Sequence, residues 1–174
     1  MALILSHINT TEISSSVSSV DLSLTGDFSV YQLIADGLTT SASGADIWLR
    51  VSTDGGSTFV SGAGDYYWGG RYRYIAVSSS GASNRGVTGG DTKIILAEAI
   101  SPIDTISLSY YLHGAKPSGQ RFNIGGRYTG TAADYVQEAT HSGSYDTAAT
   151  ITDIQILPST GTLDTGTIRL YGVA

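Results

Sequence analysis

The sequence predicts an all-β fold, a jelly-roll-like antiparallel β-sandwich. Apolar and polar residues alternate along many short segments, which is the pattern of half-buried strands. Glycine occurs 22 times in the 174 residues and separates these segments at intervals that suit turns. A hydrophobic fraction of 41% with 11 tyrosines supplies enough apolar surface for a core, although only 14% of the residues are charged. About ten short strands of this kind are typical of a sandwich or jelly roll.

The alternation is clearest in three segments. In residues 45–52, Ile47, Leu49 and Val51 share one face of the expected strand. Segments 104–112 and 166–173 alternate in the same way. Further strands are expected at 17–24, 28–35, 71–78, 92–99, 120–126, 134–140 and 149–157.

Turn chemistry marks several connections. The Asp-Gly-Gly triplet at 54–56 predicts a tight hairpin, and the Ser-Gly-Ser triplet at 142–144 also indicates a turn. Segment 78–91 is expected to be a long surface loop, since nothing in it could pack. For 131–140 a short helix with a capping box competes with the extended interpretation.

The length suits one β-sandwich domain at 17–174, preceded by a short N-terminal arm at 1–16. Fifteen carboxylates against nine lysines and arginines give a net charge of −6, which disfavours nucleic acids and anionic membranes as partners. No cysteine is present, so disulfides, thiol catalysis and zinc–thiolate sites are excluded. No apolar run is long enough to span a bilayer.

No motif for catalysis or metal binding stands out. The Ser-His-Asp arrangement requires contact that a sequence cannot show, and the strand-turn-helix elbow of hydrolases is absent. The carboxylates Asp65, Asp134 and Glu138 cannot be placed together as a glycosidase pair. We therefore expect no enzyme, no catalytic residue, no metal and no cofactor, and ordinary surface positions for the three histidines, His7, His113 and His141.

An aromatic and basic cluster at 65–74 is the best candidate for binding. Aromatic faces with polar neighbours suit sugar stacking or a protein interface, and arginine beside tyrosine allows cation–π contacts. Alternation puts Tyr72 and Tyr74 on one face and Arg71 and Arg73 on the other, but which face is buried stays open. The candidate binding or interface residues are Tyr66, Tyr67, Trp68, Arg71 and Arg73.

Two motifs carry a resemblance to a known family. The stretch GADIWLRVSTDGGST (44–58) lies within 31–68 and is followed by a tyrosine-rich segment, and GTIRLYGV (166–173) closes the second stretch, 151–173. This pattern resembles small β-rich bacteriophage virion structural proteins, both capsid-associated and tail-fibre-like. The resemblance covers most of the chain from about residue 17 onward, and it implies a structural role without catalytic residues.

The resemblance implies a capsid decoration or cement protein that docks on the capsid lattice as an oligomer, with a trimer expected from the family's habit and from cyclic symmetry. The arm at 1–16 and the exposed Tyr/Arg surface would make the contacts. The partners would be other virion proteins, either capsid or tail subunits. The expected location is the exterior of the phage particle, after assembly in the host cytoplasm. The alternative is a tail-fibre or baseplate module that binds a host surface glycan or receptor. A small hydrolase is a third, weaker hypothesis.

Overall fold

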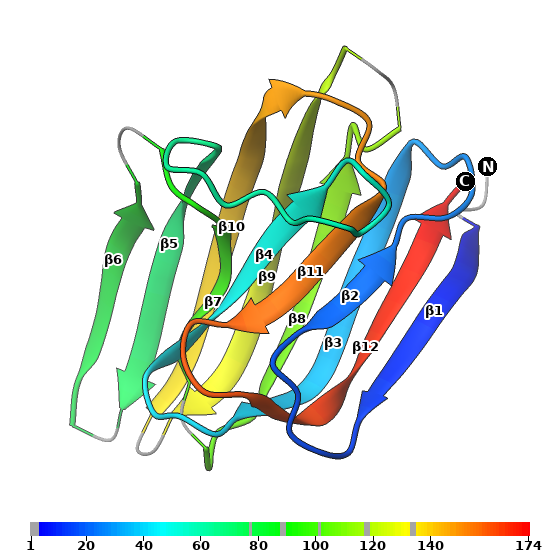
Figure 1. The fold of residues 1–174 in the computed structure, drawn as a ribbon. Helices are drawn as coiled ribbons and strands as arrows, with labels where there is room; N and C mark the ends of the chain where they lie inside the picture. Colours follow the sequence, from blue (N-terminus) through cyan, green and yellow to red (C-terminus); the bar gives the residue numbers. More distant parts are fainter. Residues whose placement is uncertain (1–3, 77, 88–89, 101, 117–118, 133–134) are drawn as a thin grey trace.

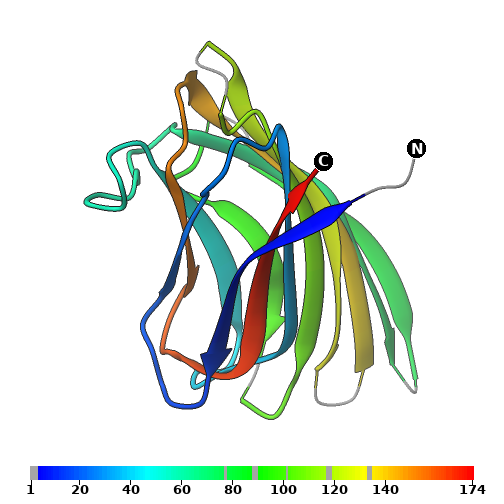
Figure 2. The ribbon, with the colours of Figure 1, turned by 90° about the vertical axis from the view of Figure 1, so that its right-hand side faces the viewer.

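The computed structural model describes residues 4–76, 78–87, 90–100, 102–116, 119–132 and 135–174, and these residues form two antiparallel sheets that face each other (Figures 1 and 2). The predicted all-β sandwich is therefore confirmed. The large sheet contains, in spatial order, β1 (Leu5–Ile13), β12 (Leu163–Val173), β3 (Val30–Thr40), β8 (Ile106–His113), β9 (Arg121–Ala132), β10 (Tyr135–Ala148), β5 (Tyr66–Ala76) and β6 (Ser80–Gly86). The small sheet contains β2 (Val20–Ser23), β11 (Asp153–Pro158), β4 (Ala45–Ser52) and β7 (Ile94–Ile100).

The chain crosses repeatedly between the two sheets. β2, β3, β4 and β5 alternate between the small and the large sheet, and β10, β11 and β12 do the same. Strands that are neighbours in sequence are therefore often in opposite layers, as in a jelly roll. A meander of three consecutive strands, β8, β9 and β10, widens the large sheet in its centre.

The core fills the space between the sheets, and the alternation of each strand decides which side chains enter it. Ile47, Leu49 and Val51 of β4 are fully buried, as the alternation predicts. From the large sheet, Tyr110 and Leu112 of β8 belong to the same core cluster and have no exposed surface. We call the face of the large sheet that points to this core its inner face, and the opposite face its outer face.

Both edges of the large sheet differ from the sequence-based expectation. Residues 5–13, expected within an arm, form β1 and pair with β12 (Figure 2). Residues 80–86, expected within a surface loop, form β6 and pair with β5. β6 lacks apolar alternation because it lies beyond the small sheet, to the left in Figure 1, with nearly all its residues exposed.

The predicted turn at 54–56 forms, but it does not join two paired strands. Gly55 and Gly56 have positive φ angles of 75° and 80°. The Asp54 carboxylate accepts hydrogen bonds from the Thr58 amide at 2.9 Å and the Thr58 hydroxyl at 2.6 Å. These bonds, with one from the Ser52 hydroxyl, lower the pKa of Asp54 to about 2. The chain then passes from β4 in the small sheet to β5 in the large one.

One further expectation about β10 is wrong, and one alternative is decided in favour of the extended interpretation. The Ser-Gly-Ser triplet at 142–144 lies inside this strand, which pairs with β9 on one side and β5 on the other. A Cβ on Gly143 would lie 2.7 Å from Ile94 Cγ2, so glycine here permits the close approach of β7 rather than a turn. The helix alternative for 131–140 fails for 135–140, which are extended, and 133–134 lie outside the described residues.

Candidate functional site

Strand β5 carries all five candidate residues, but its alternation divides them between two faces of the sheet. Tyr66 and Trp68 lie on the inner face, whereas Tyr67, Arg71 and Arg73 lie on the outer face. The face left open by the sequence is thereby assigned, because the tyrosine side of β5 is the inner one. The five residues do not converge on one site.

Tyr66 is a structural residue of the core. Its side chain is fully buried, and its hydroxyl accepts a hydrogen bond from the Val51 amide at 2.9 Å. The same hydroxyl donates to the Val60 carbonyl oxygen at 2.9 Å. Burial raises the pKa of Tyr66 well above its ordinary value. Tyr66 therefore joins the loop after β4 to the small sheet and is closed to any ligand.

Trp68 is held on the inner face by Asp91. The indole Nε1 donates to Asp91 Oδ2 at 3.0 Å, and Lys93 Nζ forms an ion pair with Asp91 Oδ1 at 2.6 Å. Burial by itself raises the pKa of Asp91, but the hydrogen bonds from Lys93, Trp68 and Thr92 outweigh this effect, and the pKa lies below its usual range. This network fixes the start of β5 against the segment before β7.

His141 is buried, so the expectation of a surface position is wrong for this histidine, whereas His7 and His113 are exposed. Its position in β10 points inward, and its ring packs against Trp68 and Tyr128 with centroid distances of 5.8 Å each. Its Nε2 lies 3.6 Å from Glu98 Oε2. No substrate can reach the imidazole, because it has no exposed surface.

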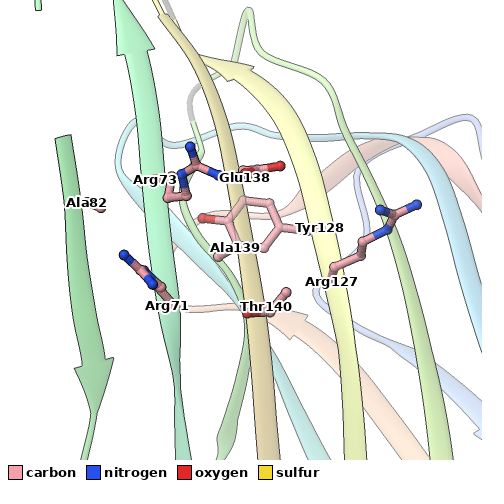
Figure 3. A pocket seen from close by; sticks show the side chains of 8 residues that line it. All are labelled: Arg71, Arg73, Ala82, Arg127, Tyr128, Glu138, Ala139 and Thr140. Atoms are coloured by element: carbon pink, nitrogen blue, oxygen red, sulfur yellow. Dashed lines mark hydrogen bonds and ion pairs between the residues drawn. The ribbon is translucent and has the colours of Figure 1, made fainter. Parts of the chain in front are cut away.

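The outer face of β5, β10 and β9 contains a hollow of about 590 Å³ (Figure 3). The strand register puts three of its residues in one row, because Thr140 of β10 lies opposite Arg71 of β5 and opposite Arg127 of β9. In the next row Glu138 lies opposite Arg73, and the two side chains form an ion pair of 3.1 Å. We call Arg71, Arg73, Arg127, Glu138 and Thr140 the arginine hollow.

The arginine hollow has an excess of positive charge in an acidic protein. It contains three of the nine lysines and arginines of the chain and one carboxylate. The Arg73–Glu138 pair is more than half exposed on both sides, so water screens it. Arg71 and Arg127 form no ion pair with any residue that the structure describes. Two guanidinium groups thus remain available to an anion from outside.

Guanidinium groups and a hydroxyl bind ligands without covalent chemistry. Arginine presents a planar set of donors that matches a carboxylate, and the Thr140 hydroxyl can both donate and accept. Within the described ranges, no group of three or more His, Asp or Glu side chains is placed to hold a metal ion. None of the described residues belongs to a helix long and apolar enough to cross a membrane.

Comparisons with known proteins add little. No family model and no curated protein matches this chain. A chain in the structure of infectious bursal disease virus Gx strain aligns with 99% of this chain at 12% identity and a TM-score of 0.15. A chain of the Gt strain aligns with 95% at 10% identity and the same TM-score of 0.15. This chain spans 38% and 40% of those two chains, and a likeness this weak carries no argument.

Sequence reasoning identified Arg71 and Arg73 but missed Arg127, Glu138 and Thr140 as members of the same site. The strand expected at 120–126 stops one residue before Arg127, and the observed strand continues to Ala132. Extending the alternation of β9 through the buried Tyr128 would have put Arg127 on the outer face. Arg127 lies beside Thr140 only because of the register in which β9 pairs with β10, and this register cannot be predicted from the local alternation of residues.

Proposed function

We propose that this chain is a bacteriophage virion structural protein that decorates or cements the exterior of the capsid and docks there as an oligomer. The motifs at 44–58 and 166–173, which resemble those of small phage virion proteins, are the basis of the proposed location. The all-β sandwich agrees with the fold that this resemblance implies. The proposal involves no catalysis, and assembly takes place in the host cytoplasm.

The free edge of β6 is the observation that supports docking most directly. β6 pairs with β5 along one side, and no other described strand pairs with its second side. All of its residues except Gly81 are exposed. Natural proteins usually protect such edges, because unpaired amides and carbonyls readily add a strand from another chain. Arg85 is the only charged residue in this strand.

Two exposed apolar residues lie near β6, on the two strands next to it in the sheet. Ile75 and Val136 lie directly opposite each other on the outer face of β5 and β10, with 65% and 58% of their surface exposed. Ile75 is also the partner of Ser80, the first residue of β6. We call β6, Ile75 and Val136 the β6 surface, and we propose that a second copy of the chain covers it in an oligomer, with a trimer as the expected state.

The location is tested by labelling intact particles with a gold-conjugated antibody against this chain and viewing them by electron microscopy. Even label over the head at high copy number supports a decoration protein. Label confined to the tail or fibre ends contradicts decoration and favours the alternative below. An unlabelled particle contradicts a virion role of either kind.

The contact surface is tested separately by measuring molar mass in solution with light scattering. The double variant Ile75→Lys/Val136→Lys should shift the oligomer to monomer, because two charges replace apolar contacts. Leu5→Lys is the matched control at the opposite edge of the sheet, in the segment first expected to be an arm; Leu5 is 43% exposed. Dissociation of the Leu5 variant alone would move the contact to β1 and contradict the β6 surface.

A tail-fibre or baseplate module that binds a host surface glycan is the second candidate function. The arginine hollow favours it, because free guanidinium groups on an open sheet face suit a ligand rather than a core. In this case the label would lie on the tail, and binding would depend on Arg71 and Arg127 rather than on β6.

A further inference from the structure

We propose that the arginine hollow binds an acidic oligosaccharide, with carboxylates of different sugar units held by Arg71 and by Arg127. This inference deepens the second candidate function above, since it names the ligand class and the residues of the glycan site. It also assigns a role to Arg127 and Thr140. These two residues lie on the outer face of the sheet, opposite to the inner face that carries Tyr66 and Trp68.

The row Arg71–Thr140–Arg127 has the dimensions that such a ligand requires. Adjacent strands lie about 4.8 Å apart, so the two arginine backbones are separated by about 10 Å, with Thr140 between them. Figure 3 shows Arg71 and Arg127 on either side of Thr140. The two guanidinium groups turn away from Thr140 to opposite sides. A sugar unit above Thr140 therefore fits between them, and the carboxylate of the next unit on either side can reach a guanidinium group.

The hollow continues across the sheet beyond Arg127. Arg127 and Thr140 also line an adjoining hollow together with Ser109 and Tyr111 of β8. Ser109 lies opposite Arg127 in the register, and Tyr111 is 38% exposed. An exposed aromatic ring beside hydroxyl groups suits the apolar face and the hydroxyls of a second sugar unit. The site is therefore extended and suits an oligosaccharide better than a single small anion.

The position of the hollow argues against an acidic peptide. Peptides that bind to sheets usually pair their backbone with an exposed edge strand. Here the floor is formed by β10 and β9, and each of these strands pairs with a neighbour on both sides. Within this floor only side chains remain for recognition, and apart from the Glu138 carboxylate, which is paired with Arg73, they offer guanidinium and hydroxyl groups. Such groups match the carboxylates and many hydroxyls of an acidic sugar.

Glu138 tunes this site rather than forming it. Its carboxylate pairs with Arg73 at 3.1 Å and places one negative charge beside the row. This charge would repel a carboxylated ligand, and the ion pair with Glu138 also makes Arg73 less available to the ligand. Removing the charge should therefore strengthen binding, a gain that no general loss of folding could imitate.

The test is titration calorimetry of the full chain with three probes: an oligogalacturonate, a neutral galacto-oligosaccharide and an oligoglutamate. We expect binding of the oligogalacturonate alone. Arg71→Gln and Arg127→Gln should each weaken it by roughly 10-fold or more, as expected for a lost charged hydrogen bond. Glu138→Gln should strengthen it. Arg169→Gln is the matched control, because Arg169 lies on the same sheet face in β12, outside the hollow, and pairs with Asp36.

Equal losses in the Arg169 variant would overturn the site, since the attraction would then be general electrostatics. Equal binding of the neutral sugar would overturn the role of the carboxylate. Binding of the oligoglutamate with the same dependence on Arg71 and Arg127 would make the ligand a peptide. No binding of the oligogalacturonate would overturn the inference directly. Because the isolated chain is measured, these outcomes are separate from where antibody label falls on a particle.

Discussion

Replacing Tyr66 by phenylalanine should destabilise the protein although it removes a single oxygen atom. β7 pairs with β4 only as far as Leu49, opposite Ile94, so Val51 lies beyond the end of that ladder. The Tyr66 hydroxyl takes the place of the missing strand by accepting from the Val51 amide and donating to the Val60 carbonyl oxygen, at 2.9 Å in both cases. The substitution Tyr66→Phe leaves both backbone groups without these partners.

The magnitude follows from burial. A buried backbone group that loses its partner costs about 1–3 kcal/mol. Val51 is fully buried, whereas Val60 is only partly buried and can turn its carbonyl group to water. Phenylalanine keeps the ring and its packing, so no cavity term is added. We expect the free energy of unfolding to fall by about 2–3 kcal/mol, with a decrease in Tm of about 5–10 °C.

Urea unfolding followed by tryptophan fluorescence measures this loss. Tyr67→Phe is the matched control, because Tyr67 is the next residue, is 42% exposed and points to the outer face. This control should stay within about 0.5 kcal/mol of the parent protein. If Tyr66→Phe also stays within that range, the hydroxyl does not cap the small sheet and the reasoning fails.

Three further predictions concern the core and its strands. Burial raises the pKa of Tyr72 from 10.0 to about 12 and that of Tyr110 further, so the unfolded chain loses these protons at lower pH than the folded chain. The contribution of these two phenols to the free energy of unfolding is therefore complete below about pH 10 and declines as the pH rises through about 12. A urea unfolding midpoint that stays constant across this pH range would contradict the burial of these phenols. A Cβ on Gly126 would lie 2.2 Å from a carbonyl oxygen of β8, whereas a Cβ on Gly125 meets nothing within 4 Å. Gly126→Ala should thus lower the free energy of unfolding by about 1–3 kcal/mol or more and Gly125→Ala by less than about 0.5 kcal/mol, and equal effects in thermal melts would show that the strands relax freely. Phe122→Ala leaves a cavity at a fully buried position, and it should lower the free energy of unfolding, measured by chemical denaturation, by about 3–5 kcal/mol. A decrease of less than about 1 kcal/mol would indicate that the core collapses into the cavity.

The sequence predicted the strands that bury one face and missed the two edge strands of the large sheet, β1 and β6. Ile47, Leu49 and Val51 alternate with polar residues because the core takes every second side chain. β6 has no such signal, since hydrogen bonds to β5 hold it in place instead of apolar burial. The turn expected at 142–144 was wrong for a related reason. Gly143 is needed there because Ile94 of another strand approaches closely, and not because the chain reverses.

The candidate site was only half accessible to sequence reasoning. The cluster at 65–74 contained Arg71 and Arg73, and the separation of Arg and Tyr between two faces follows from alternation alone. The partners Thr140 and Arg127 come from strands more than fifty positions later in the chain, and only the register of β5, β10 and β9 brings them into one row. Local patterns contain no information about that register, so the binding face could not be assembled from them.

The position of β12 between β1 and β3 has a consequence for how the protein reaches this structure. β1 and β3 are synthesised long before β12, and each depends on it as a neighbour. During synthesis their edges stay open until β12 has left the ribosome. Pairings between such distant segments form slowly, because a long loop must close before any contact offsets its entropy. We expect the large sheet to form completely only after β12 has been synthesised, and folding to proceed in milliseconds to seconds rather than microseconds.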